Sequence, residues 1–195
     1  MPENPLNVAV IIGSVREGRI APVIASWLVG QAGKRDDVAL DVIDLVETRL
    51  PGELKGHFGG ERPPEVTALQ PRLAAADAFV VVLPEYNRAY PGALKVMIDT
   101  YHAEWQAKPV GFVCYGGMSS GLRAVEQLRL VFAELHAVTV RDSVAFQSPW
   151  TMFDAEGHWP KDSAGCDAAA KVMLDQLTWY ARALRDARTA RPYAS

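Results

Sequence analysis

The sequence predicts an α/β fold, a doubly wound sheet of five parallel strands with helices on both faces. Five apolar runs alternate with stretches in which apolar residues recur at helical spacing. The first, third and fourth runs are almost continuously apolar, as strands are when helices cover both faces of a parallel sheet. The 195 residues suit one domain spanning 1–195, long enough to bury about 70% of the surface of the unfolded chain.

The strands are expected at the apolar runs, over residues 7–13, 38–45, 78–84, 109–116 and 138–146. The second run differs from the others because it alternates. It places Val38, Leu40 and Val42 on one face, with Asp41 and Asp44 outside the pattern. Such alternation favours a position at the edge of the sheet.

Helices are expected between the strands, over residues 20–34, 64–76, 91–106, 119–136 and about 165–188. Pro71 should kink or delay the second of them. Pro91 suits the first turn of the third, where its missing N–H costs nothing. In a sheet of this kind ligands bind outside the carboxyl ends of the strands, where the strand order reverses.

Composition restricts the classes of partner and compartment. The net charge of −3 gives no indication of a nucleic-acid or membrane-surface partner. The N-terminus lacks the pattern of a signal peptide, and no apolar run approaches the roughly 20 residues that cross a bilayer. Cys114 and Cys166 have neither pairing nor metal-ligand spacing, and Cys114 is expected to be a buried free thiol. A reducing cytoplasmic location is therefore expected.

The loop after the first strand, "GSVREGRIAP" (13–22), has the residues of an anion site. Gly13 allows a tight exit from the strand, Ser14 adds a hydroxyl donor, and Arg16 and Arg19 add guanidinium forks that match phosphate oxygens. The helix that follows presents unpaired N–H groups and a partial positive charge. The pattern is neither GxGxxG nor GxxxxGK[ST], which argues against a dinucleotide fingerprint or an ATP-type phosphate loop. A solvated polar loop is the alternative.

The loops after the third and fourth strands could hold a flat ring. In "PEYNRAYPG", Tyr86 and Tyr90 can form aromatic walls around a turn at Asn87, and "YGG" (115–117) lets the backbone approach a ligand closely. A phosphate anchor beside such a slot describes a mononucleotide with a large ring, such as FMN. Alternatively, the two tyrosines pack over the helix that begins near Pro91.

Three segments together resemble the NADPH-dependent FMN reductase family, which includes quinone and azo-compound reductases. They are "GSVREGR", "PEYNRAYPGALKVMID" and "YGGMSSGLRAVEQLR", and the similarity runs from the first strand to about Leu135. The resemblance implies a flavodoxin-like sheet of order 2-1-3-4-5, non-covalently bound FMN, and NADPH or NADH as co-substrate. It also implies a homodimer or homotetramer with the flavin near a subunit interface.

The family's binding residues carry over onto matching positions of this sequence. Phosphate contacts are implied for the first loop, at Ser14, Arg16, Arg19 and Ile20. Isoalloxazine contacts are implied for the other two loops, at Pro84, Glu85, Tyr86, Asn87, Tyr115, Gly116 and Gly117. Many members have Ser and Asn where this chain has Arg19 and Ala21, which implies a different distribution of phosphate contacts.

The function implied is hydride transfer from NAD(P)H through FMN to a small quinone, azo or flavin acceptor, with no catalytic side chain required. Arg88 or Arg123 could meet the 2′-phosphate of NADPH. A non-catalytic FMN-binding redox carrier is one alternative. The other is a serine esterase, since "GMSSG" matches the GxSxG elbow, with Ser119 as nucleophile and with Asp142 or Asp154 and His158 as its partners.

The composition of two further segments predicts their structural role. The glycine-rich stretch 52–63, which contains His57, is expected to be a flexible surface loop, with a loop that folds over a substrate as the alternative. Segment 149–160, rich in aromatic residues, is expected to be a packed loop or an interface segment.

Overall fold

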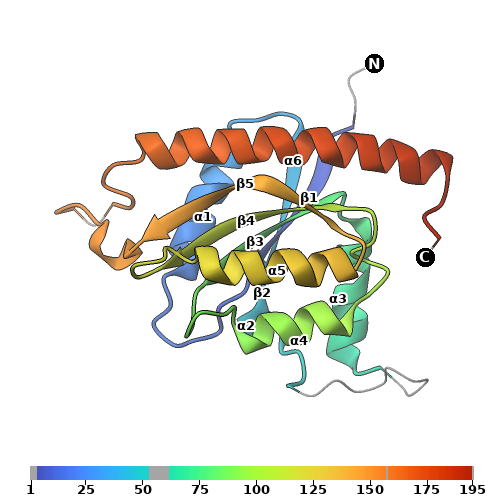
Figure 1. Cartoon of the computed structure of the whole chain (residues 1–195), viewed down its shortest axis with the longest axis horizontal. Helices are drawn as coiled ribbons and strands as arrows, with labels where there is room; N and C mark the ends of the chain where they lie inside the picture. The colour runs from blue at the N-terminus through green and yellow to red at the C-terminus, as the bar shows by residue number, and fades with distance from the viewer. Residues whose placement is uncertain (1–3, 53–61, 157, 195) are drawn as a thin grey trace.

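The computed structural model describes residues 4–52, 62–156 and 158–194. Its centre is a five-stranded parallel sheet of order β2-β1-β3-β4-β5, which confirms the predicted flavodoxin-like architecture (Figure 1). The strands are β1 (Leu6–Ile12), β2 (Val38–Asp44), β3 (Ala78–Pro84), β4 (Pro109–Gly116) and β5 (Val138–Gln147). Each lies within two residues of the range expected from the sequence.

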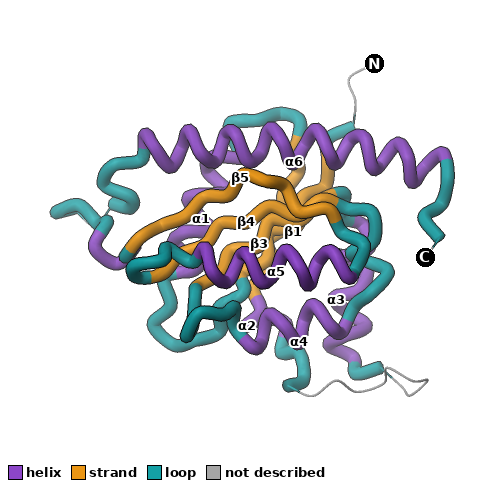
Figure 2. The backbone as a smooth tube through the Cα atoms, viewed as in Figure 1, coloured by secondary structure: helices purple, strands orange, loops and turns teal. Residues whose placement is uncertain are grey.

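Helices cover both faces of the sheet (Figure 2). One face is covered by α1 (Ala21–Ala32) and α6 (Ala164–Ala190). The other is covered by α3 (Pro64–Ala75), α4 (Gly92–Thr100) and α5 (Leu122–Glu134). Two short elements that the sequence analysis missed are α2 (Leu45–Thr48) and a single 3₁₀ turn, η1 (Pro149–Thr151). None of the described helices is both long and apolar enough to cross a membrane.

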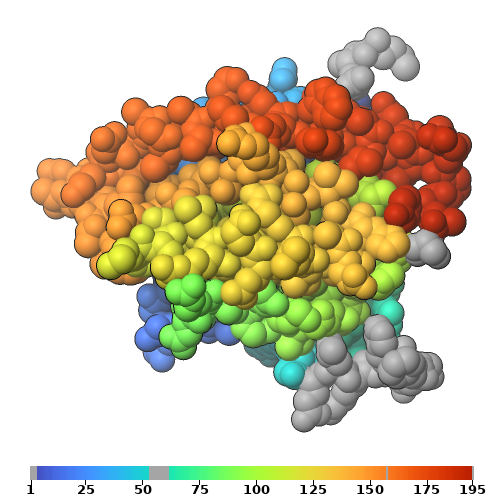
Figure 3. Space-filling model, in the orientation of Figure 1, coloured from blue at the N-terminus to red at the C-terminus, as the bar shows by residue number. Residues whose placement is uncertain are grey.

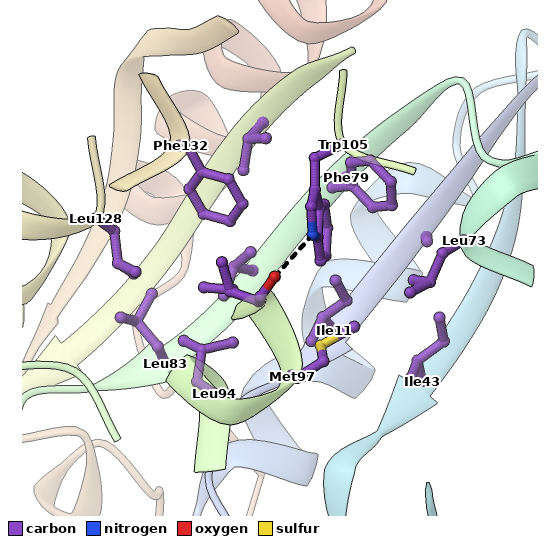
Figure 4. Close-up of a cluster of buried hydrophobic side chains, with 14 of the residues drawn as sticks. Ile11, Ile43, Leu73, Phe79, Leu83, Leu94, Met97, Trp105, Leu128 and Phe132 are labelled. Atoms are coloured by element: carbon purple, nitrogen blue, oxygen red, sulfur yellow. Dashed lines mark hydrogen bonds between the residues drawn. The ribbon is translucent and has the colours of Figure 1, made fainter. Parts of the chain in front are cut away.

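The helix expected over 91–106 is shorter than predicted. Pro91 lies just before α4 with an extended backbone (ψ 140°) rather than in its first turn, and the helix ends at Thr100. The chain then turns so that Trp105 enters the core, where its Nε1 donates to the carbonyl oxygen of Ile98 at 3.1 Å (Figure 4). Trp105 is therefore buried although it lies beyond the end of α4. This is why the apolar spacing of the sequence extends past the helix.

Other boundaries also differ from expectation. The helix expected over 119–136 begins only at Leu122, because Gly121 before it has a left-handed backbone (φ 91°). The proline at position 71 neither delays nor ends α3, which continues through it to Ala75 with the proline exposed. In β2 the edge position is confirmed, but Val42 is 42% exposed while Ile43 is fully buried on the opposite face.

The core beside α3, α4 and α5 is built around aromatic rings (Figure 4). The ring of Trp105 lies 4.6 Å from that of Phe79 and 5.5 Å from that of Phe132, centroid to centroid. Cys114 is fully buried within β4, as predicted, and burial raises the pKa of its thiol to about 12. This packed layer supports the strand ends from which the candidate site is built.

Candidate functional site

The loops after β1, β3 and β4 meet at one end of the sheet, on the left in Figure 1 and away from both chain termini. Direct backbone bonds join them: the N–H of Gly13 donates to Val82 O at 2.9 Å, and the N–H of Glu85 donates to Tyr115 O at 2.9 Å. In Figure 3 the blue, green and yellow surfaces of these segments adjoin at the same end. The three loops predicted to bind a ligand therefore lie together and form one candidate site.

The first loop presents unused donors at the start of α1. In the part of the chain that the structure describes, residues 17 and 18 form a turn, and the N–H groups of residues 15–18 and 20 have no backbone acceptor. The Arg16 side chain is exposed and makes no hydrogen bond or ion pair with a described residue. Helix α1 begins directly after this loop, at Ala21, so that its positive end faces the same region. A run of free N–H groups with an unengaged guanidinium fits a phosphate group.

Arg19 is engaged within the protein. Its Nη1 donates to Ser14 O at 2.6 Å and to Asp44 Oδ1 at 2.7 Å, and its Nη2 donates to Asp44 Oδ2 at 2.6 Å. The two side chains are only 15% and 13% exposed. This fork fixes the shape of the first loop, while a phosphate contact for Arg19 stays a prediction. Asp44 is a site residue that the sequence analysis missed, although it ends β2 at the same edge of the sheet.

Ser14 and two tyrosines bring their hydroxyl groups together. Ser14 is fully buried, and its Oγ lies 2.9 Å from the hydroxyl oxygen of Tyr86. Burial raises the pKa of Tyr115, opposed in part by a hydrogen bond with Ser14. This cluster links the three loops. Ile20 is half-buried and packs against the α1 and α6 side of the core, so it offers a ligand its backbone N–H.

The carboxylate of Glu85 is used to hold α5. It accepts hydrogen bonds from the backbone N–H of Arg123 at 3.2 Å, from Arg123 Nη1 at 3.3 Å, and from the Ser119 side chain. Burial acts to raise the pKa of Glu85, but these hydrogen bonds outweigh it and the pKa lies below its ordinary value. Because Gly121 gives α5 no side-chain cap, Glu85 supplies one from the neighbouring strand.

The turn predicted at Asn87 is present. Tyr86 and Ala89 exchange two backbone hydrogen bonds, of 2.8 and 3.0 Å, around Asn87 (φ 49°) and Arg88 (φ 72°). Two left-handed residues between a bonded pair form a two-residue hairpin of type I′. Tyr90 packs against the core beneath α4, as in the packing alternative for that residue.

The glycines leave room for a flat ligand. A Cβ built on Gly117 meets no atom within 4 Å, so this position borders open space. A Cβ on Gly116 would lie 3.1 Å from Gly121 N, and one on Gly121 would lie 2.6 Å from Tyr115 N. The buried strand residue Pro84 pairs with Tyr115 beside them. The backbone at Gly116 and Gly121 is thus tightly packed, while Gly117 beside it borders open space. This arrangement could accommodate a flat ring.

The geometry gives no support to an esterase centre. The Ser119 hydroxyl is bonded to Glu85 rather than to a histidine. Asp154 and His158 pair with each other at 3.0 Å in a separate turn. Asp142 is engaged by Gln176 and by a neighbouring arginine. Among the described residues, therefore, no nucleophile, base and acid are assembled.

The remaining segments are partly described. Trp159 packs with Phe146 (centroids 4.8 Å apart) and donates from Nε1 to Pro149 O at 2.8 Å, so this part of segment 149–160 is a packed loop, as expected. Trp150 and Phe153 are instead 58% and 40% exposed. Most of the glycine-rich stretch 52–63, including His57, lies outside the described residues.

Comparison with known proteins identifies relatives over most of the chain. Residues 6–151 match the model of the NADPH-dependent FMN reductase family. A curated NAD(P)H-dependent FMN reductase of Schizosaccharomyces pombe is 37% identical over 62% of this chain, and the match spans 65% of its own length. The NAD(P)H-dependent FMN reductase LOT6 of Saccharomyces cerevisiae is 31% identical over 74% of this chain and 82% of its own. A 2-hydroxy-1,4-benzoquinone reductase of a Burkholderia species is 25% identical, with 93% of each chain covered.

Among solved structures, the flavoenzyme NAD(P)H:acceptor oxidoreductase FerB of Paracoccus denitrificans superposes with a TM-score of 0.72. It is 23% identical, and the match covers 91% of this chain and 98% of FerB. At this identity the superposition establishes the fold.

Proposed function

The chain belongs to the NADPH-dependent FMN reductase family, and we propose on that basis that it is an NAD(P)H-dependent oxidoreductase with bound FMN that reduces small quinone, azo or flavin acceptors. The single observation that carries the proposal is the set of unused hydrogen-bond donors in the loop after β1. Its free N–H groups and the unengaged Arg16 stand at the start of α1, beside an open face at Gly117. A phosphate-binding loop beside a space for a flat ring matches the two parts of FMN, its phosphate and its isoalloxazine.

FMN, when bound, supplies the acceptance and release of hydride. The residues of this chain bind and orient it. The free N–H groups of the first loop and the guanidinium of Arg16 would hold the phosphate. Backbone groups of residues 84–87 and 115–117 would hold the ring, and Gly117, which borders open space, would leave room for a nicotinamide or an acceptor. Glu85 and Ser119 are hydrogen-bonded to each other, and their role here is structural. Hydride transfer itself would be the chemistry of the flavin and would need no side-chain acid or base.

The test is anaerobic reduction of the purified holoprotein by NADPH. Bound flavin should be bleached within seconds and reoxidised when a benzoquinone is added. Flavin that stays oxidised over minutes contradicts the reductase assignment. Steady NADPH oxidation with quinone also separates a reductase from a passive redox carrier, which would reduce once and stop. The Ser119→Ala variant should turn over quinone at an unchanged rate, because Ser119 serves only the cap of α5.

We further propose a homodimer or homotetramer in which Trp150 and Phe153 are covered. These exposed aromatic side chains directly follow the carboxyl end of β5, at the same end of the sheet as the site. Light scattering on the eluting protein measures the mass, and a monomeric mass contradicts the proposal. A cytoplasmic location is proposed as well, supported by the two free thiols, Cys114 and Cys166.

A further inference from the structure

Arg88 occupies a position that its residue type disfavours. It is the second central residue of the hairpin turn and has a left-handed backbone, with φ 72°. Glycine is the usual residue there, because any Cβ is crowded in that conformation. Residues held in disfavoured backbone regions cluster at functional sites. The position therefore prompts the question of what the arginine side chain does.

Contacts within the described chain do not explain it. The Arg88 side chain is exposed and makes no hydrogen bond or ion pair with any residue that the structure describes. Its backbone is nevertheless fixed, since Gln127 Nε2 of α5 donates to Arg88 O at 2.7 Å. The backbone of the turn is thus held by the Tyr86–Ala89 hydrogen bonds and by Gln127, while the Arg88 side chain is exposed to solvent. An exposed guanidinium on a fixed backbone is available to bind a ligand.

A second cation, Arg123 of α5, lies near the turn that carries Arg88. Arg123 lies one helical turn before Gln127 on α5, and its side chain is 46% exposed. Among the described residues, the Arg123 side chain hydrogen-bonds only with Glu85, at 3.3 Å. The Glu85 carboxylate also accepts hydrogen bonds from Ser119 and from the Arg123 backbone N–H. Two acids on the helices beside this loop are paired within their own helices: Glu126 of α5 with Arg129, and Asp99 of α4 with Lys95. Arg123 and Gln127 share one face of α5, and that face contacts the loop at Glu85 and at Arg88 O, so Arg123 lies close to the turn that carries Arg88.

We propose that Arg88, with Arg123 beside it, binds the 2′-phosphate of NADPH and gives the chain a preference for NADPH over NADH. The proposal rests on the proposed function, in which the nicotinamide stacks on a flavin held by the same loop that carries Arg88. The rest of the dinucleotide must then cross the rim of the site. The phosphate-binding loop after β1 is a separate cation site, so Arg88 does not compete with Arg16 for the FMN phosphate.

The test compares two pairs of adenine ligands that differ by one phosphate. Calorimetry on the holoprotein measures the dissociation constants of adenosine 2′,5′-bisphosphate against AMP, and of NADP⁺ against NAD⁺. Arg88→Gly removes the guanidinium and relieves the left-handed backbone, so the fold is retained. It should raise the dissociation constants of the 2′-phosphorylated ligands about tenfold or more and change those of AMP and NAD⁺ less than twofold.

Two controls sharpen the result. Arg141→Ala removes the same charge from an 88% exposed side chain on β5 and should leave all four constants unchanged. Arg88→Asn, which tolerates the same backbone, should behave like Arg88→Gly. Equal effects on both members of a pair, or no effect on either, overturn the proposal, as does wild-type protein that binds AMP as tightly as the bisphosphate. Failure of the wild type to retain FMN counts instead against the proposed function.

Discussion

Gly121 is the position where a single methyl group should do the most damage to the site. Its backbone is left-handed, with φ 91°, and an added Cβ would lie 2.6 Å from Tyr115 N and 2.7 Å from the Cβ of Cys114. The backbone conformation alone costs an alanine about 1–2 kcal/mol. Contact with a rigid strand backbone adds about 1–3 kcal/mol, because neither neighbour is the flexible end of a side chain.

Gly121→Ala should therefore lower the free energy of unfolding by about 3 kcal/mol, equivalent to a melting temperature about 6–12 °C lower for a chain of this size. Because the displaced atoms belong to Cys114 and Tyr115, retention of FMN should fall as well. Urea unfolding measures the stability, and flavin fluorescence measures the dissociation constant of FMN.

Gly117→Ala is the matched control. Its Cβ would meet no atom within 4 Å, so the free energy of unfolding should stay within about 0.5 kcal/mol of the wild type. FMN affinity should nevertheless fall, since the methyl group enters the open face of the slot. The reasoning is refuted if Gly121→Ala is as stable as the wild type, or if Gly117→Ala binds FMN with unchanged affinity.

Three other predictions concern charged residues. Arg16→Ala should weaken FMN binding by about 2 kcal/mol, roughly 30-fold in the dissociation constant measured by fluorescence titration; an unchanged constant removes Arg16 from the site. Asp44→Asn breaks the fork to Arg19 and should lower the free energy of unfolding in urea by about 1–2 kcal/mol while weakening FMN binding, and wild-type behaviour in both assays contradicts the positioning role. Hydrogen bonds from Arg35, and then from a second arginine, lower the pKa of Asp37 to about 2, so the stability that its carboxylate provides is present above pH 4 and lost as the pH falls toward 2. The free energy of unfolding should thus fall less between pH 5 and pH 3 in Asp37→Asn than in the wild type. An equal fall in both proteins argues against this linkage.

The sheet was predictable because its strands are local signals. A run such as 78–84 is apolar throughout, and it can be continuous only where helices cover both faces. Helix ends were less predictable, because Tyr101 and Trp105 continue the apolar spacing of α4 although they reach the core from a turn. The spacing of apolar residues predicts which side chains are buried. It does not show whether a helix or a turn brings them into the core.

Within the site, the sequence identified the loops but not the pairs that hold them. Arg19 was expected to face a ligand, and the structure engages it with Asp44, which lies 25 residues further along the chain. Glu85 was expected at the ring, and its carboxylate caps a helix through Arg123, 38 residues away. Such partners follow from the packing of distant elements, and the spacing of residues within one loop carries no information about them.

The central claim is that the loop after β1 binds a phosphate group so that the neighbouring loops can hold a flavin. Its most direct test is to titrate the flavin-free protein with FMN and with riboflavin, which differ only in that phosphate. FMN should bind at least about 30-fold more tightly than riboflavin, because Arg16 and the free N–H groups of the loop would contact only the phosphorylated ligand. Equal affinity for the two flavins, or binding of neither, would contradict it.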